Sequence, residues 1–171
     1  MYLKYAVIRD GINPNRGHST DAGIDFYVPK FNDEFLSDLE QKNPNCFKNF
    51  TIKDDEIIIQ PNDSILIPSG IKVEIPYGYM GLFLNKSGVA SKKGLLIGAQ
   101  VIDTFYSGEV HINLHNVSAR ESILKQDDKI VQMVLVPILS CDLSLVDEDM
   151  LYDWMNEDKV RGEGGFGSTN A

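Results

Sequence analysis

Short apolar runs separated by turn residues make up most of this chain. The pattern is clearest in EVHINLHN, residues 109–116, where Val110, Ile112 and Leu114 alternate with polar residues. A period of two is typical of a strand with one buried face. Further short apolar runs occur at 2–8, 65–68, 71–76, 79–84 and 129–138. Many short strands at such spacing predict an all-β fold of the sandwich or jelly-roll barrel type, rather than a helical or β-α-β fold.

One segment has a helical period instead. In FNDEFLSDLEQKNPNCFKNF, residues 31–50, Phe35 and Leu39 are spaced to lie on one face of a helix. Asn32 can cap this helix, acidic residues follow in its first turn, and Pro44 stands where it should end. The segment therefore predicts a short helix inserted between early strands.

The composition limits the classes of function. The 171 residues predict one domain, and a hydrophobic fraction of 43% with a charged fraction of 24% is typical of a soluble globular protein. A net charge of −9 argues against nucleic-acid or membrane-surface partners, because both favour a basic face. An anionic ligand would have to be held by local cations and backbone N–H groups.

The cysteines and the N-terminus indicate where the protein works. Cys46 and Cys141 are far apart and form no zinc-binding pattern, which favours a reduced, intracellular protein. The first ten residues, MYLKYAVIRD, have no apolar signal region, and no run approaches the roughly 20 apolar residues of a membrane span. We therefore expect a cytoplasmic or otherwise intracellular protein, in the host cell cytoplasm if the source is viral.

Asp103 and Tyr106 are three residues apart in GAQVIDTFYSGEV, residues 98–110. A carboxylate at the end of a strand can act as a general base on water, with a tyrosine ring as a wall of the site. The structural alternative is an aspartate that only starts a hairpin turn, because Asp side chains bond their own backbone in turns. The spacing alone leaves both interpretations open.

A second candidate is the loop LNKSGVASKKG, residues 84–94. Lys86, Ser87 and Gly88 place a cation, a hydroxyl and a permissive backbone side by side, which would suit a phosphate group. The loop is not a Walker A motif, because Asn85 stands where that motif requires glycine. A surface loop with scattered lysines is the alternative interpretation.

Asp21 and Asp25 flank Gly23 in STDAGIDFYVP, residues 19–29. Two carboxylates in one loop could hold Mg²⁺ through water, although aspartates are also common in turns without a metal. The three histidines, at positions 18, 111 and 115, have no spacing typical of zinc ligands or a catalytic triad.

The most unusual stretch is RGEGGFGSTN, residues 161–170. Its glycines prevent it from building a core, so a disordered tail is the simplest interpretation. Yet the ring of Phe166 can stack on a base, and Arg161 can bind phosphate oxygens with two N–H groups. A segment with both abilities could close over a nucleotide as a lid.

Five stretches in this order resemble the motifs of the trimeric dUTP pyrophosphatase (dUTPase) family: TDAGIDFY, NKSGVASKKG, GAQVIDTFYSGEV, DDKIVQMVLVPI and RGEGGFGST. The resemblance implies a distorted jelly-roll subunit, residues 1–160, in a homotrimer with shared active sites. Residues 161–171 would form a flexible arm that caps a site. It also implies hydrolysis of dUTP to dUMP and diphosphate with Mg²⁺, which lowers dUTP and supplies the precursor of dTMP.

The resemblance also implies a role for individual residues. Asp103 would orient and deprotonate the water that attacks the α-phosphorus, and Tyr106 would pack on the deoxyribose and leave no room for a 2′-hydroxyl. Asp25 would act only in the outer water shell of the metal. The main chain of one segment would read the uracil edge: Ile97, Gly98, Val101 and Ile102. Residues that would bind or place the phosphates are Lys86, Ser87, Gly88 and Gln132. In the arm, the closing residues would be Arg161, Phe166, Gly167, Ser168 and Thr169.

Two positions depart from the family pattern. Lys86 stands where arginine is usual, which replaces a planar fork by a point charge. Gln100 stands where many members have glycine, so the local turn could differ. The insert, residues 31–58, has no counterpart that we can map, and we assign it no catalytic role.

Two alternatives remain open. dCTP deaminase shares the fold, but the glutamate that it uses as general base corresponds to Asn113 here, and an amide cannot shuttle protons. A nucleotide-gated regulatory protein, or an added protein partner, could use the 31–58 insert if its phenylalanines at 31, 35, 47 and 50 were exposed. Packing of those rings in the core is the structural alternative.

Overall fold

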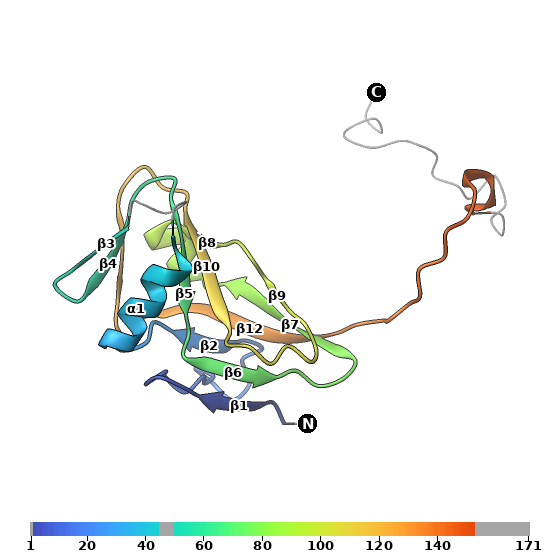
Figure 1. Ribbon diagram of the computed structural model, residues 1–171, viewed down its shortest axis with the longest axis horizontal. Coiled ribbons are helices and arrows are strands. Elements are labelled where there is room, and N and C mark those ends of the chain that lie inside the picture. The colour runs from blue at the N-terminus through green and yellow to red at the C-terminus, as the bar shows by residue number, and fades with distance from the viewer. Residues whose placement is uncertain (1, 45–49, 153–171) are drawn as a thin grey trace. The chain divides into compact units, whose positions relative to one another are not determined.

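The computed structural model describes residues 2–44 and 50–152. The chain divides into two units, residues 1–139 and 140–171. The elements of the first unit are, in chain order (Figure 1), β1 (Lys4–Val7), β2 (Ile24–Tyr27), α1 (Asp33–Lys42), β3 (Phe50–Lys53), β4 (Glu56–Ile59), β5 (Ser64–Pro68), β6 (Ile71–Glu74), β7 (Tyr79–Asn85), the π-helical turn η1 (Val89–Lys93), β8 (Leu95–Ile97), β9 (Val101–Ile102), β10 (His111–Asn116), β11 (Ser122–Lys125) and β12 (Lys129–Pro137). The second unit contributes the 3₁₀ turn η2 (Glu148–Met150). The expected boundary between residues 160 and 161 lies outside the described residues and stays a prediction.

The strands form four antiparallel sheets. Their strand orders are β1-β6, β5-β10-β8, β11-β4-β3 and β2-β12-β7-β9. Apolar side chains from all four sheets and from α1 pack into one core, in which the rings of Phe26 and Phe83 meet edge to face at 5.1 Å. The predicted all-β class is confirmed, and in the described part of the chain the strands form four short sheets rather than one closed barrel.

β10 shows why the alternating pattern predicts a strand correctly. Its burial alternates, with Ile112 and Leu114 in the core and His111, Asn113 and His115 on the other face. β2 was not predicted, because all four of its residues are buried and its sequence therefore has no alternation to detect.

The inserted helix α1 forms as its sequence predicts. The Asn32 side chain accepts a hydrogen bond from the Phe35 N–H at 2.8 Å, and the helix ends at Lys42, two residues before Pro44. Phe35 and Leu39 are buried, and α1 packs beside β5 (Figure 1).

Most of the phenylalanines of the insert belong to the core. Phe35 is buried and stacks on Phe31 with ring centroids 5.3 Å apart, while Phe31 and Phe50 pack against the core cluster. Core packing, one of the two interpretations of these rings, therefore holds for all three. Phe47 lies outside the described residues.

Candidate active site

A pocket of about 340 Å³ gathers most of the residues expected to contact phosphates. We call it the lysine pocket, and it is lined by Lys86, Ser87, Gly88, Val89, Lys92, Lys93, Lys129 and Gln132. Four lysines line it in a chain whose net charge is −9, although Lys86 and Lys129 are ion-paired with Asp25 and Lys93 with Asp128. Sequence reasoning missed Lys92, Lys93 and Lys129, although all three occur in the quoted motifs.

A β-bulge brings Lys129 and Gln132 to the same pocket. Residues three apart on a regular strand point to opposite faces. Against β2, however, the register of β12 shifts between Lys129 and Val131, so that Ile130 is an extra residue and both Ile130 and Val131 are buried. The shift lets both polar side chains line the lysine pocket.

Two glycines leave room at this pocket: Gly88 lines it, and Gly23 lies against the lining residue Gln132. A Cβ at Gly23 would lie 2.2 Å from the Gln132 Oε1. The Gln132 side chain can therefore hold its position only because residue 23 has no side chain. A Cβ at Gly88 would meet no heavy atom of residues 2–44 or 50–152 within 4 Å, and the Gly88 φ of −67° is ordinary. Neither packing against the described residues nor the backbone geometry explains glycine at 88, whereas close approach of a ligand would.

Asp25 is the buried acidic centre beside the lysine pocket. One carboxylate oxygen bonds the Lys86 ammonium, and the other lies 3.0 Å from the Lys129 Nζ. Burial by itself would raise the pKa of Asp25, but the hydrogen bonds and charges of the two lysines outweigh that effect and lower its pKa. Asp25 is thus held ionised on β2, not in the loop that the sequence suggested.

A second pocket, of about 280 Å³, contains Asp103. We call it the Asp103 pocket, and it is lined by Leu66, Ala99, Val101, Ile102, Asp103, Tyr106, Val110 and His111. The Asp103 side chain is exposed at the end of β9, in the turn where the Tyr106 N–H bonds the Asp103 carbonyl at 3.3 Å. Leu66 and His111 were not predicted here, and the sequence offers no signal for Leu66.

Tyr106 has a defined position in this pocket. Its hydroxyl donates to the carbonyl of Glu109 at 2.8 Å. Its ring lies against Gly108, where a Cβ would come within 2.6 Å of the Tyr106 Cζ. A side chain at position 108 would therefore displace the Tyr106 ring from this position.

Ile97 and Gly98 do not line the Asp103 pocket. The Ile97 N–H bonds the Asn85 side chain at 2.7 Å, and the Gly98 N–H bonds the Asn113 carbonyl at 2.9 Å. Both groups are therefore used within the chain, and recognition of uracil would have to use other main-chain groups of this segment. Gln100 is exposed.

Among the described residues of one chain, the two pockets share no lining residue. The arm residues expected to close the site, Arg161, Phe166, Gly167, Ser168 and Thr169, lie outside the described residues. In the described part of the chain, no helix is long and apolar enough to span a membrane.

The fold is an antiparallel β fold with one lysine-lined pocket, which could bind an anionic ligand, and one pocket that contains an exposed carboxylate. A family model described as dUTPase matches residues 52–170. The chain therefore belongs to the dUTPase family, as its motifs predicted.

Curated relatives agree with the family model. The deoxyuridine 5′-triphosphate nucleotidohydrolase of Hydrogenobaculum sp. (strain Y04AAS1) is 36% identical over 118 residues, which cover 68% of this chain and 77% of the relative. The enzyme of the same name from Paramecium bursaria Chlorella virus 1 is 36% identical over 115 residues, which cover 67% of this chain and 77% of the relative.

The fold is similar to that of solved dUTPases. The dUTPase of Staphylococcus bacteriophage 80alpha, solved with dUPNHPP, superposes with a TM-score of 0.71 at 25% identity, over 99% of each chain.

Proposed function

We propose that this chain is a dUTP diphosphatase that hydrolyses dUTP to dUMP and diphosphate. Water is added and the bond between the α-phosphorus and the oxygen bridging to the β-phosphorus is broken, so diphosphate leaves. Asp103 orients the water and accepts its proton, and Tyr106 packs on the deoxyribose. Family membership and the residues gathered in the two pockets support this assignment.

The observation that carries the proposal is that the two pockets have no described lining residue in common. The lysine pocket supplies cations for a triphosphate, and the Asp103 pocket supplies a base and a ring for a nucleoside. Because they share no residue, we infer that a complete site joins the Asp103 pocket of one copy to the lysine pocket of another. This arrangement is the one expected of a homotrimer with shared active sites, with the arm closing over each site.

The residues of the lysine pocket suit Mg²⁺ only as an ion carried by substrate. Four lysines line the pocket, and both carboxylate oxygens of Asp25 already bond ammonium groups. Asp25 can therefore reach the metal only through water, in the outer shell. When bound, Mg²⁺ would neutralise charge on the triphosphate.

The decisive assay compares turnover of dUTP with that of dTTP, dCTP and UTP. We expect turnover of dUTP well above that of the others, and almost none with Asp103→Asn. The control Asp33→Asn removes an exposed acid at the start of α1 and should keep full activity. An inactive parent or an active Asp103→Asn enzyme would disprove the assignment. Ammonia from dCTP would instead favour the deaminase alternative.

Subunit mixing tests the shared site. Asp103→Asn and the double variant Lys86→Ala, Ser87→Ala should each be inactive alone, because each lacks one pocket. Mixed trimers would contain sites assembled from two intact pockets, so activity should return when the two are refolded together. Separately refolded proteins, combined afterwards, are the matched control. Mixed trimers without activity would mean that each site is built from one chain.

A further inference from the structure

Arg9 connects the inserted helix α1 to Glu109, which stands in the sequence between the lining residues Tyr106 and Val110 of the Asp103 pocket. The Arg9 Nη1 donates to the Asp38 Oδ2 on α1 at 2.5 Å, and its Nη2 bonds the Glu109 carboxylate. The three side chains are only 16%, 16% and 9% exposed, so water screens these ion pairs weakly. The backbone of Arg9 has a φ of 46°, an uncommon conformation for a residue with a side chain, and the ion pairs can offset its strain.

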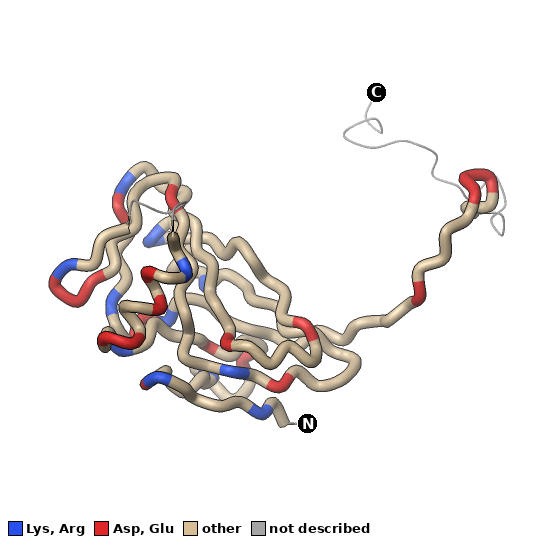
Figure 2. Tube along the Cα trace, viewed as in Figure 1, with Lys and Arg blue, Asp and Glu red and all other residues tan. Residues whose placement is uncertain are grey.

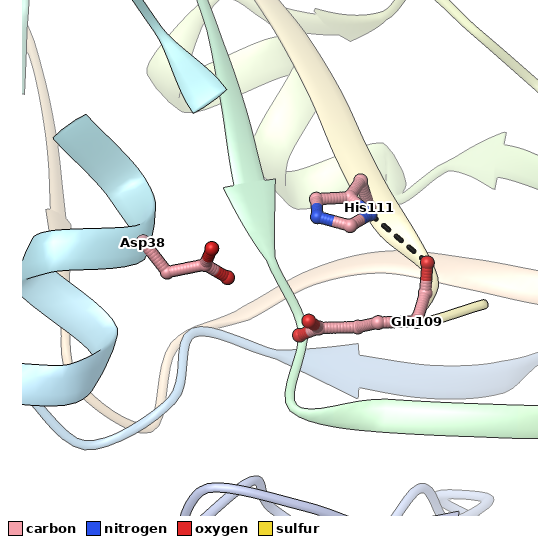
Figure 3. A group of neighbouring side chains, drawn as sticks. All are labelled: Asp38, Glu109 and His111. Carbon is pink, nitrogen blue, oxygen red and sulfur yellow. Dashed lines mark hydrogen bonds between the residues drawn. The ribbon is translucent and has the colours of Figure 1, made fainter. Parts of the chain in front are cut away.

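Asp38, Glu109 and His111 have the residue types of a metal site, and Figure 3 shows Asp38 pointing from α1 toward the other two. However, Arg9 bonds both carboxylates. Burial would lower the pKa of Arg9, but Glu109 and Asp38 outweigh that effect and raise it, so the guanidinium stays charged. We therefore interpret the group as an ion-pair network.

Glu109 is also hydrogen-bonded to Tyr106, so it links Arg9 to the Tyr106 side chain. Its side chain accepts the Gly70 N–H at 2.6 Å, which fixes the residue at the end of the turn. Its carbonyl accepts the Tyr106 hydroxyl at 2.8 Å and lies 2.9 Å from the His111 Nδ1. A carbonyl can only accept, so His111 carries its proton on Nδ1. Both side chains line the Asp103 pocket and are oriented by this one carbonyl.

A second connection joins α1 to Leu66, another lining residue of the Asp103 pocket. Asn43, which caps the end of α1, is buried and forms two hydrogen bonds with Leu66 on β5. Its Nδ2 donates to the Leu66 carbonyl at 2.9 Å, and its Oδ1 accepts the Leu66 N–H at 2.9 Å. Leu66 lines the Asp103 pocket. α1 therefore reaches that pocket at two separate points.

We propose that α1 positions the sugar-binding part of the active site by two connections, one through Asp38, Arg9 and Glu109 and one through Asn43. These four residues form the α1 network. Its function is to keep Tyr106 close enough to the deoxyribose to exclude a 2′-hydroxyl, and so to maintain selectivity for dUTP over UTP. The inference rests on the proposed function.

Asp38→Ala tests the network directly. It should lower the ratio of kcat/KM for dUTP to that for UTP by roughly threefold or more, mainly through a higher KM for dUTP and a gain in turnover of UTP. The matched control is Glu40→Ala, which removes an exposed acid from the same helix. The acidic positions of α1 are red in Figure 2. This control should leave the ratio unchanged. If Asp38→Ala unfolds below the assay temperature, Asp38→Asn is tested in its place, because asparagine keeps the shape of the side chain and removes its charge.

A double-mutant cycle separates positioning from general stability. Tyr106→Phe removes the hydroxyl that Glu109 holds, so adding Asp38→Ala to it should lower the ratio little further. Equal losses for dUTP and UTP together with a lower Tm would mean a purely structural role and would overturn the inference. An unchanged ratio in an active enzyme would also overturn it. A parent enzyme without dUTP turnover would refute the proposed function itself.

Discussion

Replacing Asp25 by asparagine would remove the negative charge between two lysines while keeping the shape of the side chain. The Asp25 side chain is 7% exposed, and those of Lys86 and Lys129 are 25% and 42% exposed. Breaking a buried ion pair costs about 3–5 kcal/mol, whereas an exposed pair contributes about 0–1 kcal/mol. The Lys129 pair is discounted for its exposure, and asparagine can still accept from Lys86. We therefore expect Asp25→Asn to lower the free energy of unfolding by about 2–3 kcal/mol at pH 7.

The stabilisation by Asp25 should depend on pH, because only the ionised carboxylate pairs with the two lysines. The pKa of Asp25 is lowered in the folded protein, so its stabilisation is fully present above the unfolded pKa of about 3.9. That stabilisation is lost as the pH falls through the lower, folded pKa. The difference between the parent and Asp25→Asn should therefore be largest near neutral pH and shrink below about pH 4.

Urea denaturation at several pH values measures the effect. The midpoint should shift at pH 7 without a change in the m-value. Asp142→Asn is the control, because Asp142 is exposed and forms no ion pair with any described residue. Equal stability of Asp25→Asn and parent at pH 7, or an undiminished difference at pH 3, would show that the two lysines do not stabilise the fold through this carboxylate.

Three further substitutions test the packing and the lysine pocket. Phe35→Ala removes a ring that is 2% exposed and should cost about 3–5 kcal/mol of stability in urea denaturation; a loss below 1 kcal/mol would contradict its core position. Gly98→Ala would place a Cβ 2.0 Å from the Asn113 Oδ1, so it should destabilise by about 1–3 kcal/mol, and an unchanged Tm would show that the Asn113 side chain moves freely. Lys86→Arg restores the fork usual in the family, so kcat for dUTP should be retained or increase, and a large loss would mean that the pair with Asp25 requires lysine.

Local features were predicted well because they depend on residues close together in the chain. The helix α1 was correct from its Asn32 cap to its end before Pro44, since capping and helical spacing are short-range effects. The strand β10 was correct because half of it faces the core. β2 was missed, and Asp25 was therefore placed in a loop, because a fully buried strand has no alternating pattern.

The residues of the candidate site were predicted only where they belong to a recognised sequence motif. Lys86, Ser87 and Gly88 share a pocket as expected, and so do Asp103 and Tyr106. The insert received no catalytic role, since nothing in its sequence reveals that α1 lies next to Arg9 and Leu66.

The amino-acid sequence by itself determined the strand-rich class, the inserted helix and the motifs of the dUTPase family. Only the tertiary structure decided that Lys129 and Gln132 line one pocket, because a bulge of one residue changes which face a strand residue occupies. Only the fold pairs Arg9 with Glu109, 100 residues away, and Asp25 with Lys86, 61 residues away. Contacts between distant residues depend on strand register and sheet packing, and no local pattern in the sequence records either.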